Sequence, residues 1–140
     1  MNSTKRRFQI ACLQTSPQPD FQTALDQAIS LAEEAATSGA EFIATPEYCG
    51  GLKTEGASFA PPSAPEASHP VLNGLQTFAK DRSKFVLIGS VAIDGPDNKI
   101  LNRSFLIDKE GNIVSRYDKI HLFDINLSEQ QSYRESATVR

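Results

Sequence analysis

The chain has 140 residues, 39% hydrophobic and 22% charged, so it is long enough and apolar enough to bury one core. Its formal net charge of −3 is untypical of a nucleic-acid-binding module, which normally has a basic face. The longest apolar run, at 85–93, is much shorter than the roughly 20 residues that cross a bilayer. We therefore expect one domain that binds neither nucleic acid nor membrane.

The first part of the chain predicts a βαβ unit. An apolar strand pattern at 8–14 ends in a proline-rich stretch, and Asp20 is a good N-cap for the helix that follows. Apolar residues then recur every three or four positions until Gly39, which suits the helix C-terminus. A short strand at 41–45 completes the unit, whose crossover is expected to be right-handed.

The middle of the chain predicts a long loop and then a second helix. The segment from Gly50 to Pro70 is rich in glycine and proline, and loops of about twenty residues in a small domain are often functional. Apolar spacing predicts a helix at 71–82. The nearly continuous apolar run at 85–93 is typical of a strand buried on both faces.

The remainder predicts an antiparallel meander that fades toward the end. Strand patterns at 100–107 and 113–117 are separated from each other, and from the strand before them, by short turns. After Phe123 the pattern weakens, and 128–140 indicates no clear strand or helix.

The predicted elements leave one face of the sheet open. If both helices lie on the same face, nothing in the chain covers the other face of the 85–93 strand. Either the helices lie on opposite faces, as in flavodoxin-like folds, or a second sheet comes from outside the chain.

Two charged residues are candidates for chemistry. Glu47 follows a strand and a proline, at the edge where open α/β sheets place ligands, and a carboxylate there suits a general base. Lys119 follows the last meander strand, so its ammonium is expected to meet Glu47 and to stabilise charge on a substrate oxygen. The alternatives are a solvated loop glutamate and a surface lysine paired with a neighbouring aspartate.

Metal, nucleotide and disulfide chemistry are not indicated. Asp118, His121 and Asp124 recur every third residue, a spacing that scatters ligands on a helix, so we expect no metal and a packed or capping His121. No glycine-rich phosphate loop is present. Cys12 is expected to be a core residue, and Cys49 lies too near Glu47 in sequence to be its nucleophile. Two cysteines and the absence of a signal-peptide pattern predict a cytoplasmic protein.

Three segments together resemble the nitrilase superfamily, the carbon–nitrogen hydrolases. Residues 8–14 are similar to its first strand, and Thr45-Pro46-Glu47 resembles the segment with its glutamate base. The most specific likeness is Tyr117-Asp118-Lys119-Ile120-His121-Leu122-Phe123-Asp124, which is similar to the segment with its catalytic lysine. The likeness runs from about Phe8 to Arg140, and is greatest to the branch of ω-amidases and deaminated-glutathione amidases.

This resemblance implies an α/β fold that is the N-terminal half of an αββα sandwich, with a mixed sheet and two main helices on one face. The second sheet would then cover the open face. Residues 1–140 would be a partial domain with a core from about residue 8. It would be a truncated piece, the product of a broken reading frame or one part of a split enzyme.

The resemblance also implies an activity, the hydrolysis of a small amide to an acid and ammonia. Glu47 would be the base, Lys119 the oxyanion-stabilising cation, and Glu135 a second glutamate that helps to position the substrate. The family's nucleophilic cysteine lies beyond the lysine segment, whereas no cysteine follows Cys49 here, so we expect the chain alone to be inactive. No metal or organic cofactor is implied.

The expected partners are a small-molecule amide and either further copies of the chain or a complementing C-terminal half. An alternative from another class is a non-catalytic module that pairs with a relative or with itself through its uncovered sheet face. A weaker alternative is a flavodoxin-like binding domain with helices on both faces.

Overall fold

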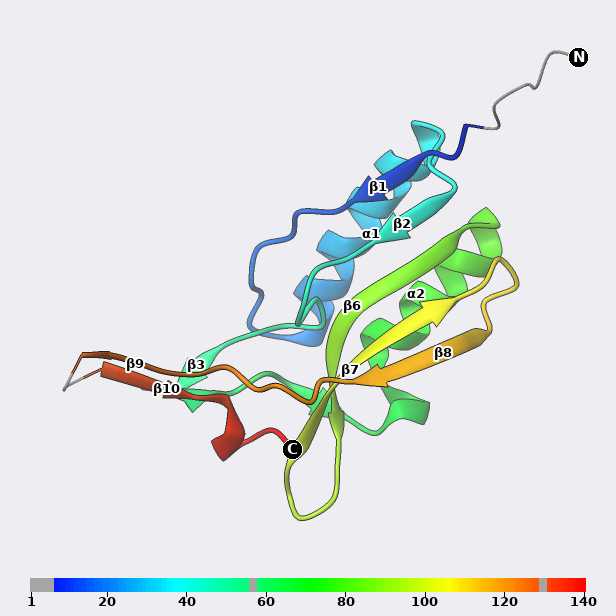
Figure 1. The fold of residues 1–140 in the computed structure, drawn as a ribbon. Helices are drawn as coiled ribbons and strands as arrows, with labels where there is room; N and C mark the ends of the chain where they lie inside the picture. The colour runs from blue at the N-terminus through cyan, green and yellow to red at the C-terminus, as the bar shows by residue number, and fades with distance from the viewer. Residues whose placement is uncertain (1–6, 56–57, 129–130) are drawn as a thin grey trace, which may run out of the picture.

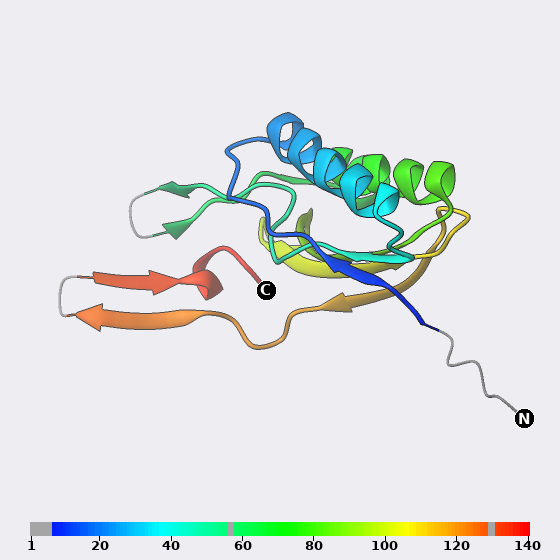
Figure 2. The same ribbon diagram turned by 90° about the horizontal axis from the view of Figure 1, so that it is seen from above.

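The computed structural model describes residues 7–55, 58–128 and 131–140 (Figure 1). In this part of the chain, a six-stranded mixed sheet has the order β1-β2-β6-β7-β8, and β5 pairs with β6 beside that path. Both helices cover the same face of the sheet, as Figure 2 shows from above. The predicted α/β class and one-sided helix layer are therefore confirmed, and the flavodoxin-like arrangement is wrong.

The N-terminal βαβ unit forms as predicted. Strands β1 (Ile10–Cys12) and β2 (Phe42–Ala44) pair in parallel, and helix α1 (Phe21–Thr37) connects them. The Asp20 carboxylate accepts the N–H of Thr23 at 2.9 Å and so caps the helix. Gly39 has φ of +95°, a left-handed conformation that glycine adopts without steric cost where a helix ends.

Helix α2 (Pro70–Arg82) begins at a histidine cap. The His69 ring accepts the N–H of Leu72 through Nδ1 at 3.3 Å, and Pro70 fills the first helical position, where no N–H is needed. One side of the helix is buried against the sheet: Val71, Leu72, Leu75, Phe78 and Ala79. In the described residues, no helix is both long and apolar enough to cross a membrane.

The predicted antiparallel meander consists of β6 (Phe85–Asp94), β7 (Ile100–Ile107) and β8 (Ile113–Asp118). Val86 and Ile88 on β6 are buried beneath the helices, whereas Phe85 and Leu87 are only partly buried. The expectation of burial on both faces is therefore wrong for the first half of β6, because the described residues include no layer over its second face.

That second face, which we call the open face, is apolar. Side chains alternate across a strand, so Phe85, its register partner Phe42, and Leu87 point away from the helices. The rings of Phe42 and Phe85 stack at 6.4 Å, and Ile10 and Tyr117 are each 57% exposed.

The loop expected from Gly50 to Pro70 contains short elements. Strands β3 (Thr54–Glu55) and β4 (Ser58–Phe59) form a hairpin, β5 (Ser63–Ala64) pairs with the end of β6, and a 3-10 turn η1 spans Glu66–Ser68. Local patterning did not predict them, because β5 depends on a strand far along the chain for its hydrogen bonds.

The expectation of no clear strand or helix at 128–140 is also wrong. Strands β9 (Asp124–Ser128) and β10 (Gln131–Arg134) pair with each other, and a 3-10 turn η2 (Glu135–Ala137) follows. Val139 is buried and forms a bridge with Ile100 at the start of β7. Cross-strand pairing and polar contacts hold this segment, so it lacks the apolar alternation that predicts a strand.

Candidate active site

A bulge in β6 positions the segment that carries Glu47. The register of β6 against β7 shifts between Ile88 and Val91. A side chain at Gly89 would place its Cβ 2.4 Å from the Thr45 carbonyl oxygen, so only glycine allows the segment after β2 to approach this closely. The bulge thus lets the end of β2 lie directly against β6.

Ser90 then holds the turn that follows Pro46. Its hydroxyl accepts the N–H of Tyr48 at 2.9 Å, and its carbonyl accepts the N–H of Cys49 at 3.0 Å. Tyr48 has φ of +52°, a left-handed conformation that is uncommon outside glycine and is frequent at functional sites. The turn leaves Glu47 at the C-terminal edge of β2, with its side chain 53% exposed.

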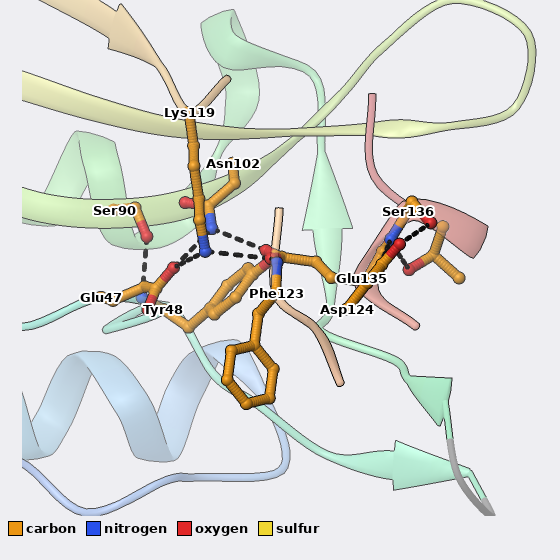
Figure 3. A network of polar contacts seen from close by, with 10 residues as sticks. Glu47, Tyr48, Ser90, Asn102, Lys119, Phe123, Asp124, Glu135 and Ser136 are labelled. Atoms are coloured by element: carbon orange, nitrogen blue, oxygen red, sulfur yellow. Dashed lines mark hydrogen bonds and ion pairs between the residues drawn. The ribbon is translucent and has the colours of Figure 1, made fainter. Parts of the chain in front are cut away.

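Lys119 lies between two carboxylates. Its backbone N–H donates to the Asn102 carbonyl at 2.9 Å, which continues the pairing of β8 with β7. Its Nζ is 2.9 Å from Glu47 Oε1 and 2.9 Å from Glu135 Oε2 (Figure 3). Three residues distant in sequence therefore meet at one point.

Glu135 is the buried member of this group, with its side chain only 2% exposed. Burial alone would raise its pKa, but four donors outweigh that effect and hold the pKa below its usual value. They are the Phe123 N–H at 2.6 Å, Lys119 Nζ at 2.9 Å, the Tyr48 hydroxyl at 2.8 Å and Asn102 Nδ2 at 3.1 Å. Glu135 is therefore an ionised carboxylate at neutral pH.

Lys119 remains a cation for the complementary reason. Its partial burial would lower its pKa, but the hydrogen bonds and charges of Glu47 and Glu135 outweigh this and raise the pKa above its ordinary value. An ammonium has three N–H groups, and these two carboxylates occupy two of them. One N–H remains to bind a ligand oxygen.

These charged groups form one wall of a cavity of about 270 Å³. Leu52, Phe59 and Phe123 form an apolar wall, and the last two rings meet edge to face at 6.3 Å. Apolar walls with a few convergent polar groups are typical of sites for small molecules.

The structure brings together the three site residues that the sequence singled out: Glu47, Lys119 and Glu135. Sequence reasoning missed Tyr48, Asn102 and the Phe123 N–H, all of which bind Glu135. The available signal was Asn102 within the strand pattern at 100–107, because an amide that is buried in a strand requires hydrogen-bond partners.

The remaining candidates lie elsewhere. Asp118 pairs with Arg103 at 2.6 Å, Asp124 accepts the Ser136 N–H at 3.0 Å, and His121 is exposed rather than packed. Within 7–55, 58–128 and 131–140, no group of three or more histidine, cysteine, aspartate and glutamate side chains could hold a metal ion.

The two cysteines differ in their surroundings. Cys12 is exposed, so the expectation that it is a core residue is wrong. The reason is that the short strand β1 lies at the edge of the sheet, where the described residues do not cover it. Cys49 is buried, and its burial raises the pKa of the thiol to about 11. Neither cysteine lines the 270 Å³ cavity.

Comparison with known proteins identifies the family. The sequence profile of the carbon–nitrogen hydrolases matches residues 9–140, so the chain belongs to the carbon–nitrogen hydrolase family. It is 32% identical over 131 residues to a deaminated glutathione amidase of Synechocystis, covering 92% of this chain and 47% of the relative. It is 28% identical over 132 residues to the human omega-amidase NIT2, covering 94% and 47% respectively. The chain thus spans about half the length of these curated relatives.

Solved structures agree on the fold. The Caenorhabditis elegans NitFhit protein superposes with a TM-score of 0.76 at 18% identity, over 94% of this chain and 32% of that protein. A variant of the Nesterenkonia amidase superposes with a TM-score of 0.70 at 21% identity, over 95% and 47%. That structure shows covalent addition of the acetamide moiety of fluoroacetamide at the active site cysteine of the amidase.

Proposed function

We propose that this chain provides the acid–base part of an active site that hydrolyses a small amide to a carboxylic acid and ammonia. The observation that carries the proposal is the Lys119 ammonium, which lies 2.9 Å from Glu47 and 2.9 Å from Glu135 beside a cavity. Membership of the carbon–nitrogen hydrolase family supports it.

In this proposal Glu47 accepts the proton of a cysteine thiol, and the thiolate attacks the amide carbonyl carbon. The remaining N–H of Lys119 stabilises the oxyanion of the tetrahedral intermediate. The amide nitrogen takes the proton from Glu47 and leaves as ammonia, so a thioester remains. Glu47 then takes a proton from a water molecule, whose oxygen attacks the thioester carbonyl carbon. The carbon–sulfur bond breaks to release the acid, and Glu47 returns the proton to the sulfur.

The nucleophile in this scheme comes from outside these 140 residues. Cys49 is buried with a thiol pKa of about 11, and Cys12 is exposed on the sheet, so neither is suited to attack in the cavity. The active site cysteine of the Nesterenkonia amidase supports a cysteine nucleophile. We therefore propose that residues 1–140 form a partial domain that does not hydrolyse amides by itself.

The open face suggests how such a domain is completed. We propose that the second sheet of the family fold covers Phe42, Phe85 and Leu87, as part of the same enzyme. The exposed Ile10 and Tyr117 also favour the second candidate function, a module that pairs with further copies or with a relative through this face.

A chimera tests the proposed hydrolase. Residues 1–140 joined to the C-terminal part of the Synechocystis relative should release ammonia from small amides, whereas residues 1–140 alone should not. Glu47→Gln and Lys119→Ala should each lower kcat/KM at least about 100-fold. The exposed Glu34→Gln and Lys80→Ala are matched controls that should retain activity.

Two results would contradict the proposal. One is amide turnover by the 140-residue chain alone, and the other is a chimera whose activity survives loss of Glu47 or Lys119. Stable binding of the chain to the separate C-terminal part without turnover would favour the pairing module.

A further inference from the structure

Asn102 bridges the two carboxylates of the site. It lies on β7 and is 2% exposed. Its single amide nitrogen is 2.8 Å from Glu47 Oε1 and 3.1 Å from Glu135 Oε1 (Figure 3). Since an amide nitrogen carries two hydrogens, one can point to each carboxylate, and the buried donor is fully used.

The bridge adds no charge to the site. Glu47 and Glu135 bring two negative charges against the one positive charge of Lys119. A second lysine in place of Asn102 would neutralise the base, whereas a third carboxylate would repel the other two. A neutral donor binds both carboxylates without adding a charge of either sign.

The bridge also distinguishes the two oxygens of Glu47. Oε1 accepts from both Asn102 Nδ2 and Lys119 Nζ, whereas no described residue donates to Oε2. An oxygen that already accepts two donors is the weaker proton acceptor, so Oε2 is the more basic atom. Asn102 and Lys119 together therefore orient the carboxylate with Oε2 free.

The sheet anchors Asn102 itself. It is the register partner of Ala92 on β6, and its carbonyl accepts the backbone N–H of Lys119 at 2.9 Å. One residue thus connects the backbone of the cation to the side chains of both carboxylates. The hydrogen-bonded strands β6 to β8 therefore fix the position of Asn102, and through it the positions of the Glu47, Lys119 and Glu135 side chains.

We propose that Asn102 is a positioning residue, which fixes Glu47 Oε2 as the atom that exchanges protons with the thiol and the water. This inference rests on the proposed function for the role of Glu47. The bridge between the carboxylates is a separate claim, which can be tested without any activity.

The first test uses nuclear magnetic resonance of the 140-residue chain. The two Nδ2 protons of Asn102 should resonate downfield of ordinary side-chain amides, because each donates to an ionised carboxylate. Glu47→Gln should move one of them upfield and Glu135→Gln the other. If either substitution leaves both protons unmoved, the bridge does not exist and the proposal is overturned.

The second test compares Asn102→Leu with Ile107→Val in the active chimera. Leucine has nearly the same shape but no donor, and Ile107 is a buried residue of the same strand far from the carboxylates. Asn102→Leu should lower kcat about 10- to 100-fold with KM within about threefold, and should move the acidic limb of the pH–rate profile to higher pH. Ile107→Val should change neither kcat nor the profile.

Equal kinetic effects of the two variants would overturn the positioning role, because a general loss of stability would then explain both. If the unsubstituted chimera is inactive but the amide protons respond as expected, the proposed hydrolase fails and the proton-exchange role of Glu47 Oε2 fails with it, while the bridge stands.

Discussion

At the scale of single residues, the candidate site depends on a buried charge with enough partners. Glu135 is ionised in the interior because four donors surround it. Without it, Lys119 and Asn102 would keep only their bonds to Glu47, and the Tyr48 hydroxyl and the Phe123 N–H would lose the carboxylate that accepts from them. This reciprocity makes Glu135 a structural residue as well as a residue of the site.

Replacing Glu135 with leucine should therefore destabilise the chain by about 1–3 kcal/mol at pH 7, since it leaves the Tyr48 hydroxyl and the Phe123 N–H without their carboxylate acceptor. Glu135→Gln should cost less, because glutamine retains hydrogen-bonding atoms. Urea unfolding of the three proteins, followed by circular dichroism, measures the difference. A leucine variant as stable as the original chain would show that the donors find other partners.

The charge of Glu135 also predicts a response to acid. Its pKa in the fold lies below the ordinary value of 4.5, so it stabilises the fold above pH 4.5 and this contribution is lost as the pH falls below that value. Glu135→Gln should show a smaller loss of stability between pH 4.5 and 3. An unchanged pH dependence in the variant would assign the acid sensitivity to other groups.

At the scale of elements, junctions between strands and helices decide where side chains point. The start of α2 depends on a neutral histidine, because only an unprotonated Nδ1 can accept the Leu72 N–H. Burial lowers the pKa of His69 from 6.5 to about 4, which keeps the ring neutral in the fold.

The His69 cap should lose its effect in a pH range distinct from that of Glu135. The lowered pKa of His69 stabilises the fold fully above pH 6.5, where the ring is neutral in both the folded and the unfolded chain. As the pH falls from 6.5 toward 4, the free energy of unfolding should decrease by about 3 kcal/mol in total. His69→Asn keeps a capping acceptor that does not titrate, so its stability should vary little over that range. Thermal unfolding at half-unit pH steps measures both proteins, and parallel curves would contradict the assignment.

The bulge in β6 is the second decisive junction. Gly89→Ala places a Cβ 2.4 Å from the Thr45 carbonyl oxygen, so the segment carrying Glu47 must move. We expect a loss of about 1–3 kcal/mol of stability, as for other overpacked sites, together with loss of chimera activity. Gly95→Ala, in the turn after β6, places a Cβ 2.9 Å from the Lys99 carbonyl oxygen. It is therefore a control that is also crowded but lies away from the site, and it should lower stability while chimera activity is kept. Full activity in Gly89→Ala would show that close approach is not required.

At the scale of the whole molecule, the fold has one covered and one open face. Two helices cover the first face (Figure 2). The second presents aromatic and aliphatic side chains in the described residues. An apolar face of this kind drives association unless another layer covers it.

The isolated chain should therefore self-associate, and the double variant Ile10→Lys, Tyr117→Lys should do so less, because both side chains are more than half exposed. Light scattering after gel filtration measures the masses. The same changes should destabilise the chimera, where we expect the second sheet to cover this face. A monomeric original chain at high concentration would contradict the prediction.

Local physics in the sequence already determined much of this protein. The Asp20 cap, the helix spacings and the apolar meander follow from near neighbours in the chain, so α1, α2 and β6 to β8 were predictable. The segments around Glu47 and Lys119 were recognisable from their residues, and the position of each at a strand end indicated that they meet.

Only the tertiary structure decided the rest. The strands of 54–64 and 124–134 are held by distant or paired partners, so their local sequence carries little signal. The convergence of Tyr48, Asn102 and the Phe123 N–H on Glu135 joins four segments through side-chain geometry. The spacing of apolar residues in the sequence indicates which faces of the helices and strands are buried. Hydrogen bonds between distant residues form only when the folded sheet brings those residues together.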